Sequence, residues 1–118
     1  MSVSATEPAL GGGVTLVTKG AGLNELRDWL PGARTVADVS DLAWDSLPVV
    51  ISDSPEVFSP ALREAILDQK ARLVWVLRTG DGLPIEASGF PIYFYLSPPF
   101  YRVLLETTVR NALESLRL

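Results

Sequence analysis

The sequence predicts an α/β fold, a single doubly wound domain built on a five-stranded parallel sheet. Three observations predict it: short β-branched or aromatic runs recur along the chain, amphipathic stretches alternate with them, and Gly/Pro turn signals separate the two. Alternation at this spacing implies right-handed crossovers, with helices on both faces of the sheet. At 118 residues the chain is long enough for one core and too short for two.

Five segments carry the strand signal. The clearest is Leu-Pro-Val-Val-Ile-Ser-Asp over residues 47–53, where an apolar run suited to burial on both faces ends in the carboxylate of Asp53. The second segment is short and flanked by charge, which favours an edge of the sheet. The fifth is rich in aromatic residues. The predicted strands are residues 14–18, 34–37, 49–53, 73–77 and 92–96.

Helical stretches follow the strands. Leu23, Leu26 and Leu30 have the spacing of one helical face. Ser59 and Pro60 are a hydroxyl N-cap followed by proline at the first helical position, a strong helix start. The predicted helices cover residues 23–30, 42–47, 60–70 and a final stretch with the buried stripe Leu105, Val109, Ala112, Leu113 and Leu116.

Other stretches carry weaker signals. Residues 1–13 end in three consecutive glycines and are predicted to be a flexible tail, so the folded domain is expected to cover residues 14–118. Ser40 and Asp41 resemble the N-cap and first turn of the short second helix. Residues 81–91 contain two glycines and two prolines, so a fourth helix is expected to be shortened or missing.

The composition excludes several classes of function. The chain contains no cysteine and no histidine, which removes disulfides, thiolate catalysis, the commonest metal ligand and every Ser-His or Cys-His arrangement. We therefore expect no catalytic centre, metal or cofactor. A formal charge of −4 and scattered basic residues argue against nucleic acid as the main partner. No apolar stretch suits a membrane span and no secretory signal is visible, so we expect a cytoplasmic protein.

Three short motifs follow the predicted strands in order. Val50-Ile51-Ser52-Asp53 ends the third strand in an aspartate, Thr79 follows the fourth strand, and Ser97-Pro98-Pro99-Phe100 follows the fifth. Over roughly residues 14–117, this arrangement resembles the receiver domains of two-component response regulators. The resemblance implies a flavodoxin-like sheet of order 2-1-3-4-5, with Asp53 as the candidate phosphoacceptor and Thr79 as a candidate phosphate-reading residue.

The chain departs from receivers in the parts that handle phosphate. The family has two acidic residues after the first strand, which hold magnesium, and here that place reads Thr18-Lys19-Gly20. Ser97 or Pro98 stands where the family has a lysine, which leaves Arg78 or Lys19 as the substitute cation and Lys19 as a second candidate for phosphate reading. Together with the eroded fourth helix, these changes predict a pseudo-receiver, a receiver fold without the phosphoryl chemistry.

The aromatic fifth strand predicts an interaction surface. Tyr93 and Tyr95 share one face of the strand because side chains alternate along it, and Tyr101 and Arg102 follow in the chain. Tyrosine and arginine are favoured at protein interfaces. We expect a protein partner, or a second copy of the chain, to bind through the fifth strand and final helix, with no direct binding of nucleic acid or membrane.

The sequence therefore predicts a non-enzymatic signal-transduction module, a pseudo-receiver that mediates protein–protein interaction or dimerisation in a two-component-type regulator. Because such a module needs something to regulate, we expect the chain to be one domain of a longer protein. One alternative is a functional receiver phosphorylated on Asp53. A second is a small-ligand-binding flavodoxin-like domain, with the ligand over the loops at Thr18, Asp53 and Thr79.

Overall fold

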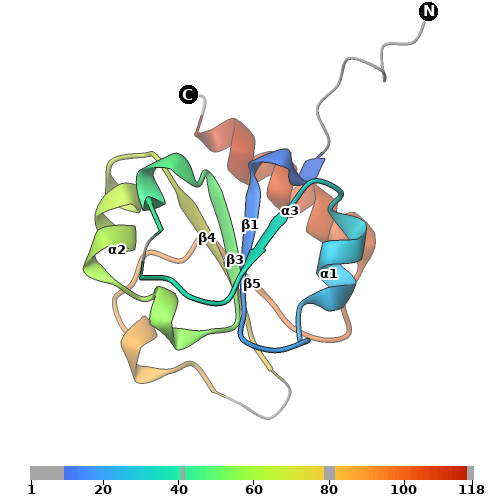
Figure 1. Ribbon diagram of the computed structural model, residues 1–118, viewed down its shortest axis with the longest axis horizontal. Coiled ribbons are helices and arrows are strands. Elements are labelled where there is room, and N and C mark those ends of the chain that lie inside the picture. The colour runs from blue at the N-terminus through green and yellow to red at the C-terminus, as the bar shows by residue number, and fades with distance from the viewer. Residues whose placement is uncertain (1–9, 41, 79–81, 117–118) are drawn as a thin grey trace, which may run out of the picture.

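The structure, a computed structural model, describes residues 10–40, 42–78 and 82–116 (Figure 1). Its centre is a parallel sheet with the strand order β2-β1-β3-β4-β5. The strands are β1 (Val14–Val17), β2 (Arg34–Val36), β3 (Val49–Ser52), β4 (Arg72–Val76) and β5 (Phe94–Leu96). The predicted doubly wound α/β fold with order 2-1-3-4-5 is confirmed, and the short second strand lies at an edge as expected.

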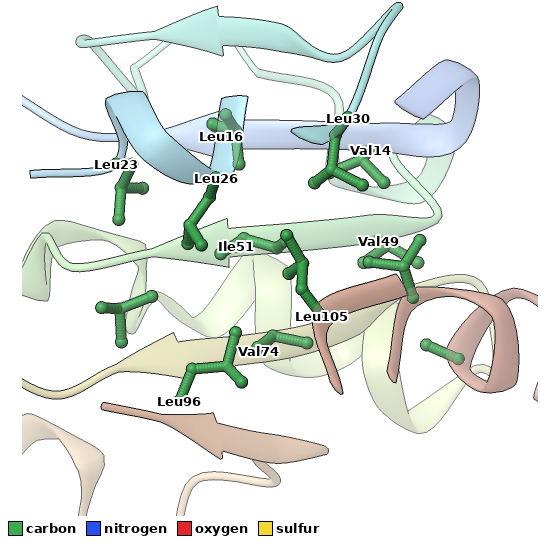
Figure 2. Close-up of a cluster of buried hydrophobic side chains, with 13 residues drawn as sticks. Val14, Leu16, Leu23, Leu26, Leu30, Val49, Ile51, Val74, Leu96 and Leu105 are labelled. Atoms are coloured by element: carbon green, nitrogen blue, oxygen red, sulfur yellow. The ribbon is translucent and has the colours of Figure 1, made fainter. Parts of the chain in front are cut away.

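Within the described residues, three α-helices cover the sheet, on both of its faces (Figure 1). They are α1 (Asn24–Trp29), α2 (Pro60–Leu67) and α3 (Arg102–Ser115). Leu26 of α1 and Leu105 of α3 belong to one buried cluster, whereas Leu62 of α2 belongs to the other. Figure 2 shows the first cluster, in which Leu26 and Leu105 lie over side chains such as Ile51 of β3.

The residues of β3 explain why helices are needed on both sides. Val49 and Ile51 are buried in the α1/α3 cluster, and Val50 between them is buried in the α2 cluster. A strand without a polar face is stable only where both faces are covered, which is the usual situation in parallel sheets. The run of β-branched residues before Asp53 therefore fixes β3 in the middle of the domain.

Local signals set the helix boundaries. The Ser59 hydroxyl accepts a hydrogen bond from the Leu62 N–H at 3.2 Å, so the predicted N-cap of α2 is confirmed. The helix ends at Leu67, before the predicted residue 70, and the chain turns at Gln69, which has a φ of 62°. The turn after α1 passes through Gly32, whose φ of 91° suits glycine.

Two segments differ from the sequence prediction. The helix expected over residues 42–47 is a single 3-10 turn, Trp44–Ser46, because Ser40 does not cap it. Instead the N–H and hydroxyl of Ser40 both donate to Asp38 Oδ1, at 2.9 and 2.7 Å. Short polar side chains commonly make such local bonds in turns. The other half of the expected cap, Asp41, lies outside the described residues.

The start of the fold also differs from the expected boundary. Leu10–Gly13, assigned above to the tail, form a 3-10 turn. The Gly11 N–H donates to the Pro31 carbonyl at 3.2 Å, and a side chain at Gly11 would clash with the backbone there. The described domain therefore begins before residue 14, and residues 1–9 lie outside it.

The connection from β4 to β5 has no α-helix in its described part, as the sequence predicted, and contains one 3-10 turn, Ile85–Ala87. Aromatic side chains fill the face that a helix would cover. The Phe58 ring lies 4.6 Å from the Trp75 ring and 5.0 Å from the Phe90 ring, between centroids. Among the described residues no helix is long and apolar enough to cross a membrane.

Candidate functional site

A cleft of about 450 Å³ opens where β3 and β4 end, at the carboxyl edge of the sheet. Open parallel sheets place ligands and chemistry at this edge, because the loops after the strands converge there. Its wall includes Lys19 from the loop after β1, Asp53 from the end of β3, and Trp75 and Arg78 from β4 and the residues after it. Pro84, from the connection without a helix, closes one side.

Asp53 is held by an arginine. Its side chain is only 2% exposed, and its Oδ2 accepts a hydrogen bond from Arg78 Nη2 at 2.9 Å. Its other oxygen, Oδ1, is buried and makes no hydrogen bond within the described part of the chain. Arg78 is 60% exposed on its side chain, so the guanidinium reaches from solvent onto a buried carboxylate. The candidate phosphoacceptor Asp53 is thus paired with the permanent cation of Arg78.

A serine not singled out by the sequence analysis fixes the position of Asp53. The Ser52 hydroxyl donates to the Val17 carbonyl at 2.6 Å and accepts from the Ser54 N–H at 2.9 Å. These bonds tie the ends of β1 and β3 together and set the direction of the loop that carries Asp53. The sequence did contain a signal for this role, because Ser52 is a hydroxyl residue at the end of an otherwise apolar strand. A buried hydroxyl requires a hydrogen-bond partner.

Lys19 does not bind Asp53. Its ammonium forms an ion pair with Oε1 of Glu56, in the 3-10 turn Pro55–Val57 that follows β3. Both side chains of that pair are exposed, so the pair contributes little to stability. The cation in contact with Asp53 is Arg78, whereas Lys19 lies on another part of the wall. Thr79, the other predicted phosphate-reading residue, lies outside the described residues.

The described residues of the cleft do not fit a magnesium site. Magnesium binds mainly carboxylate oxygens and water, in octahedral geometry. The described residues contain no group of three or more acidic side chains placed to hold a metal ion. After β1 the chain offers Thr18, whose hydroxyl accepts from the Gly20 N–H at 3.3 Å, and the cation of Lys19. The guanidinium of Arg78 already occupies one oxygen of Asp53.

Asp38, which follows β2, is an exposed acidic residue with its own local hydrogen bonds. Hydrogen bonds from the backbone N–H of Ser40, and then from its hydroxyl, hold the pKa of Asp38 below its ordinary value, with a small further contribution from the charge of Lys19. Asp38 is fully exposed. Its two bonds are local, so it forms a solvated turn rather than part of the cleft.

The predicted interaction surface is exposed. Nine large hydrophobic side chains in the described part of the chain are exposed, and six of them lie in the short segment from β5 into α3: Tyr93, Phe94, Tyr95, Tyr101, Val103 and Leu104. The register places Phe94 beside Val74 and Tyr95 beside Trp75, so these two rings point to opposite faces of the sheet. Arg102 donates to Glu106 at 3.2 Å, one turn further along α3.

Comparison with known proteins identifies the fold but no sequence family. The sequence matches no protein-family model, and no curated protein is a significant sequence match. A response regulator receiver domain protein from Clostridium thermocellum is 20% identical with a TM-score of 0.59, over 86% of this chain and 94% of that one. NtrX from Brucella abortus, solved with ADP, is 20% identical with a TM-score of 0.60, over 88% of this chain but only 26% of that one.

A putative pilus assembly-related protein from Burkholderia pseudomallei is also similar, at 14% identity and a TM-score of 0.56, over 92% of this chain and 96% of that one. At these identities the likeness concerns the fold alone. The chain therefore has a receiver-like, flavodoxin-like fold, and its described part has three helices around a parallel sheet of order 2-1-3-4-5.

Proposed function

We propose that this chain is a non-enzymatic signal-transduction module, a pseudo-receiver that acts through protein–protein contacts of β5 and α3. The receiver-like fold supports the signalling class. The observation that carries the rest of the proposal is the pairing of Asp53 with Arg78 in a cleft whose described residues include no group of three or more acidic side chains placed to hold a metal ion.

The chemistry of phosphoryl transfer explains why this pairing matters. An acceptor aspartate must bring an oxygen in line with the phosphorus, and a metal must offset the charge that gathers on the transferred group. Here one oxygen of Asp53 is bound to Arg78 and the other is buried. Arginine stays charged at every accessible pH, so deprotonation of the guanidinium does not release Asp53 from this ion pair. The receiver-like fold is thus kept, but Asp53, at the position of the phosphoacceptor, is already paired with Arg78.

The exposed segment from β5 into α3 supports the second half of the proposal. A soluble domain usually scatters its exposed apolar side chains, whereas a concentration of them marks a contact surface. Tyr93, Tyr95 and Tyr101 present rings with polar tips, the type favoured where one protein meets another. The cleft and this segment are different parts of the domain, so loss of phosphoryl chemistry leaves the contact surface intact.

The test is the intact mass of the protein after incubation with a small-molecule phosphodonor and magnesium, beside an Asp53→Asn control. We expect no gain of a phosphoryl group in either sample. A magnesium-dependent gain of one group that the control lacks would overturn the proposal and make the protein a working receiver, phosphorylated on Asp53. Arg78→Ala supplies a second comparison, since it tests whether freeing the carboxylate is enough to allow transfer.

A further inference from the structure

The outer edge of β5 is unprotected. Edge strands usually carry charges, prolines or bulges that discourage pairing with another chain. Residues 92–96 contain no charge and no proline, and the residues Tyr93, Phe94 and Tyr95 are 38%, 37% and 45% exposed. In the sheet of the described residues β5 pairs only with β4, which leaves its other side open. The opposite edge strand, β2, carries the exposed Arg34.

The residue types along this edge follow the same order in both directions. Ile92-Tyr93-Phe94-Tyr95-Leu96 is aliphatic, tyrosine, phenylalanine, tyrosine, aliphatic. In an antiparallel pair about a two-fold axis at Phe94, that residue meets Phe94 of a second copy and Tyr93 meets Tyr95 of the second copy. Two-fold interfaces must be complementary to themselves, and aromatic side chains directly opposite each other stabilise antiparallel pairs.

The faces of the sheet agree with this arrangement. A two-fold axis perpendicular to the sheet keeps each face continuous from one copy to the next. Phe94 shares the face of Val74, under α1 and α3, and Tyr95 shares the face of Trp75, under α2. Pairing would therefore place the two phenylalanines together on one face and the tyrosines together on the other, covering rings that each copy leaves partly in water.

We propose that two copies of this chain associate through β5, edge to edge and antiparallel, to form one continuous ten-stranded sheet. The inference rests on the proposed function, because it names the partner of the β5 surface. The observation favouring a second copy over an unrelated peptide is the self-complementary order of the five residues 92–96. The strand Phe94–Leu96 is short and buries little area on pairing, so the dimer is weak and depends on concentration.

The test is sedimentation velocity of the full chain over a concentration series, with charge reversal at the two-fold axis. Phe94→Lys and Phe94→Glu each place like charges opposite each other, so each variant alone should raise the dimer Kd about tenfold or more. An equimolar mixture of the two should restore association, because unlike charges then face one another. Ile85→Lys is the matched control: it adds a charge at a residue of the turn Ile85–Ala87 that is 87% exposed and lies outside the proposed contact surface, and it should leave the Kd unchanged.

Hydrogen exchange of the unaltered protein gives a measurement that needs no variant. The amides of residues 93–96 should exchange more slowly as concentration rises, while those of β2 should not change. A monomer at every concentration, a mixture that fails to associate, or an Ile85→Lys variant as defective as the others would overturn the inference. Those results leave the phosphodonor experiment untouched, so failure of the dimer and failure of the pseudo-receiver proposal are distinguishable.

Discussion

Substituting Arg78 tests how the protein keeps a buried carboxylate. Asp53 is 2% exposed and Arg78 is 60% exposed on the side chain, so the two partners of the pair do not lose the same solvation. In Arg78→Ala the carboxylate stays buried and loses its hydrogen bond. In Asp53→Asn the charge disappears, and the arginine is left with its own access to water. We therefore expect Arg78→Ala to be the more destabilising substitution.

The magnitude follows from the cost of leaving a buried acceptor unpaired. That cost is about 1–3 kcal/mol, and the half-exposed position of Arg78 argues for a middle value of about 2 kcal/mol. Unfolding entropy is about 2.1 cal/mol/K per residue, which for 118 residues gives about 0.25 kcal/mol/K. Arg78→Ala should thus lower the Tm by about 8 °C. Asp53→Asn should cost about 1 kcal/mol or less.

The assay is urea unfolding at neutral pH, followed by far-ultraviolet circular dichroism, for the wild type, both single variants and the double variant. In the double variant no buried charge is left unpaired, so it should be more stable than Arg78→Ala alone, with a coupling energy of about 1 kcal/mol or more. Additive single effects, or an Arg78→Ala variant within about 0.5 kcal/mol of wild type, would refute the reasoning that Arg78 neutralises Asp53.

Two further predictions concern the loops around the cleft. A Cβ at Gly22 would lie 2.9 Å from Asp53 Oδ2, whereas one at Gly20 meets nothing within 4 Å. Gly22→Ala should therefore destabilise the protein by about 1–3 kcal/mol in urea unfolding, and equal effects of Gly20→Ala would contradict this. Ser40→Ala should raise the pKa of Asp38 part of the way to 3.8, since the hydroxyl is lost and the backbone N–H remains. The carboxyl carbon shift of Asp38, followed against pH by NMR, measures this, and an unchanged pKa would count against the hydroxyl bond.

The elements could be read from the sequence because their signals are local. Runs such as Val49-Val50-Ile51 indicate strands buried on both faces, and Ser59-Pro60 marks a helix start whatever surrounds it. The expected helix over residues 42–47 failed for a local reason as well. Ser40 has two hydrogen-bonding options, and it bonds to Asp38 rather than to the helix.

The site was less accessible to sequence reasoning, because its pairs join residues far apart in the chain. The ends of the strands showed that Asp53 and Arg78 would lie at the same edge of the sheet. They did not show that the two side chains bind each other across 25 residues, or that Lys19 pairs with Glu56 across 37. Such choices depend on loop conformations, which composition and periodicity do not determine.

The aromatic cluster beneath the β4–β5 connection affects how this stretch can change in evolution or engineering. A helical crossover needs whole turns to stay in register, so insertions of one or two residues disturb it. Here the ring of Phe90 on Phe58 fixes the end of the connection, ahead of β5. Residues between Gly82 and Phe90 can then lengthen at an entropic cost that grows slowly, by about 0.6 kcal/mol per doubling of loop length. The connection is therefore the natural place to insert a tag or a small domain, provided that Phe90 is kept.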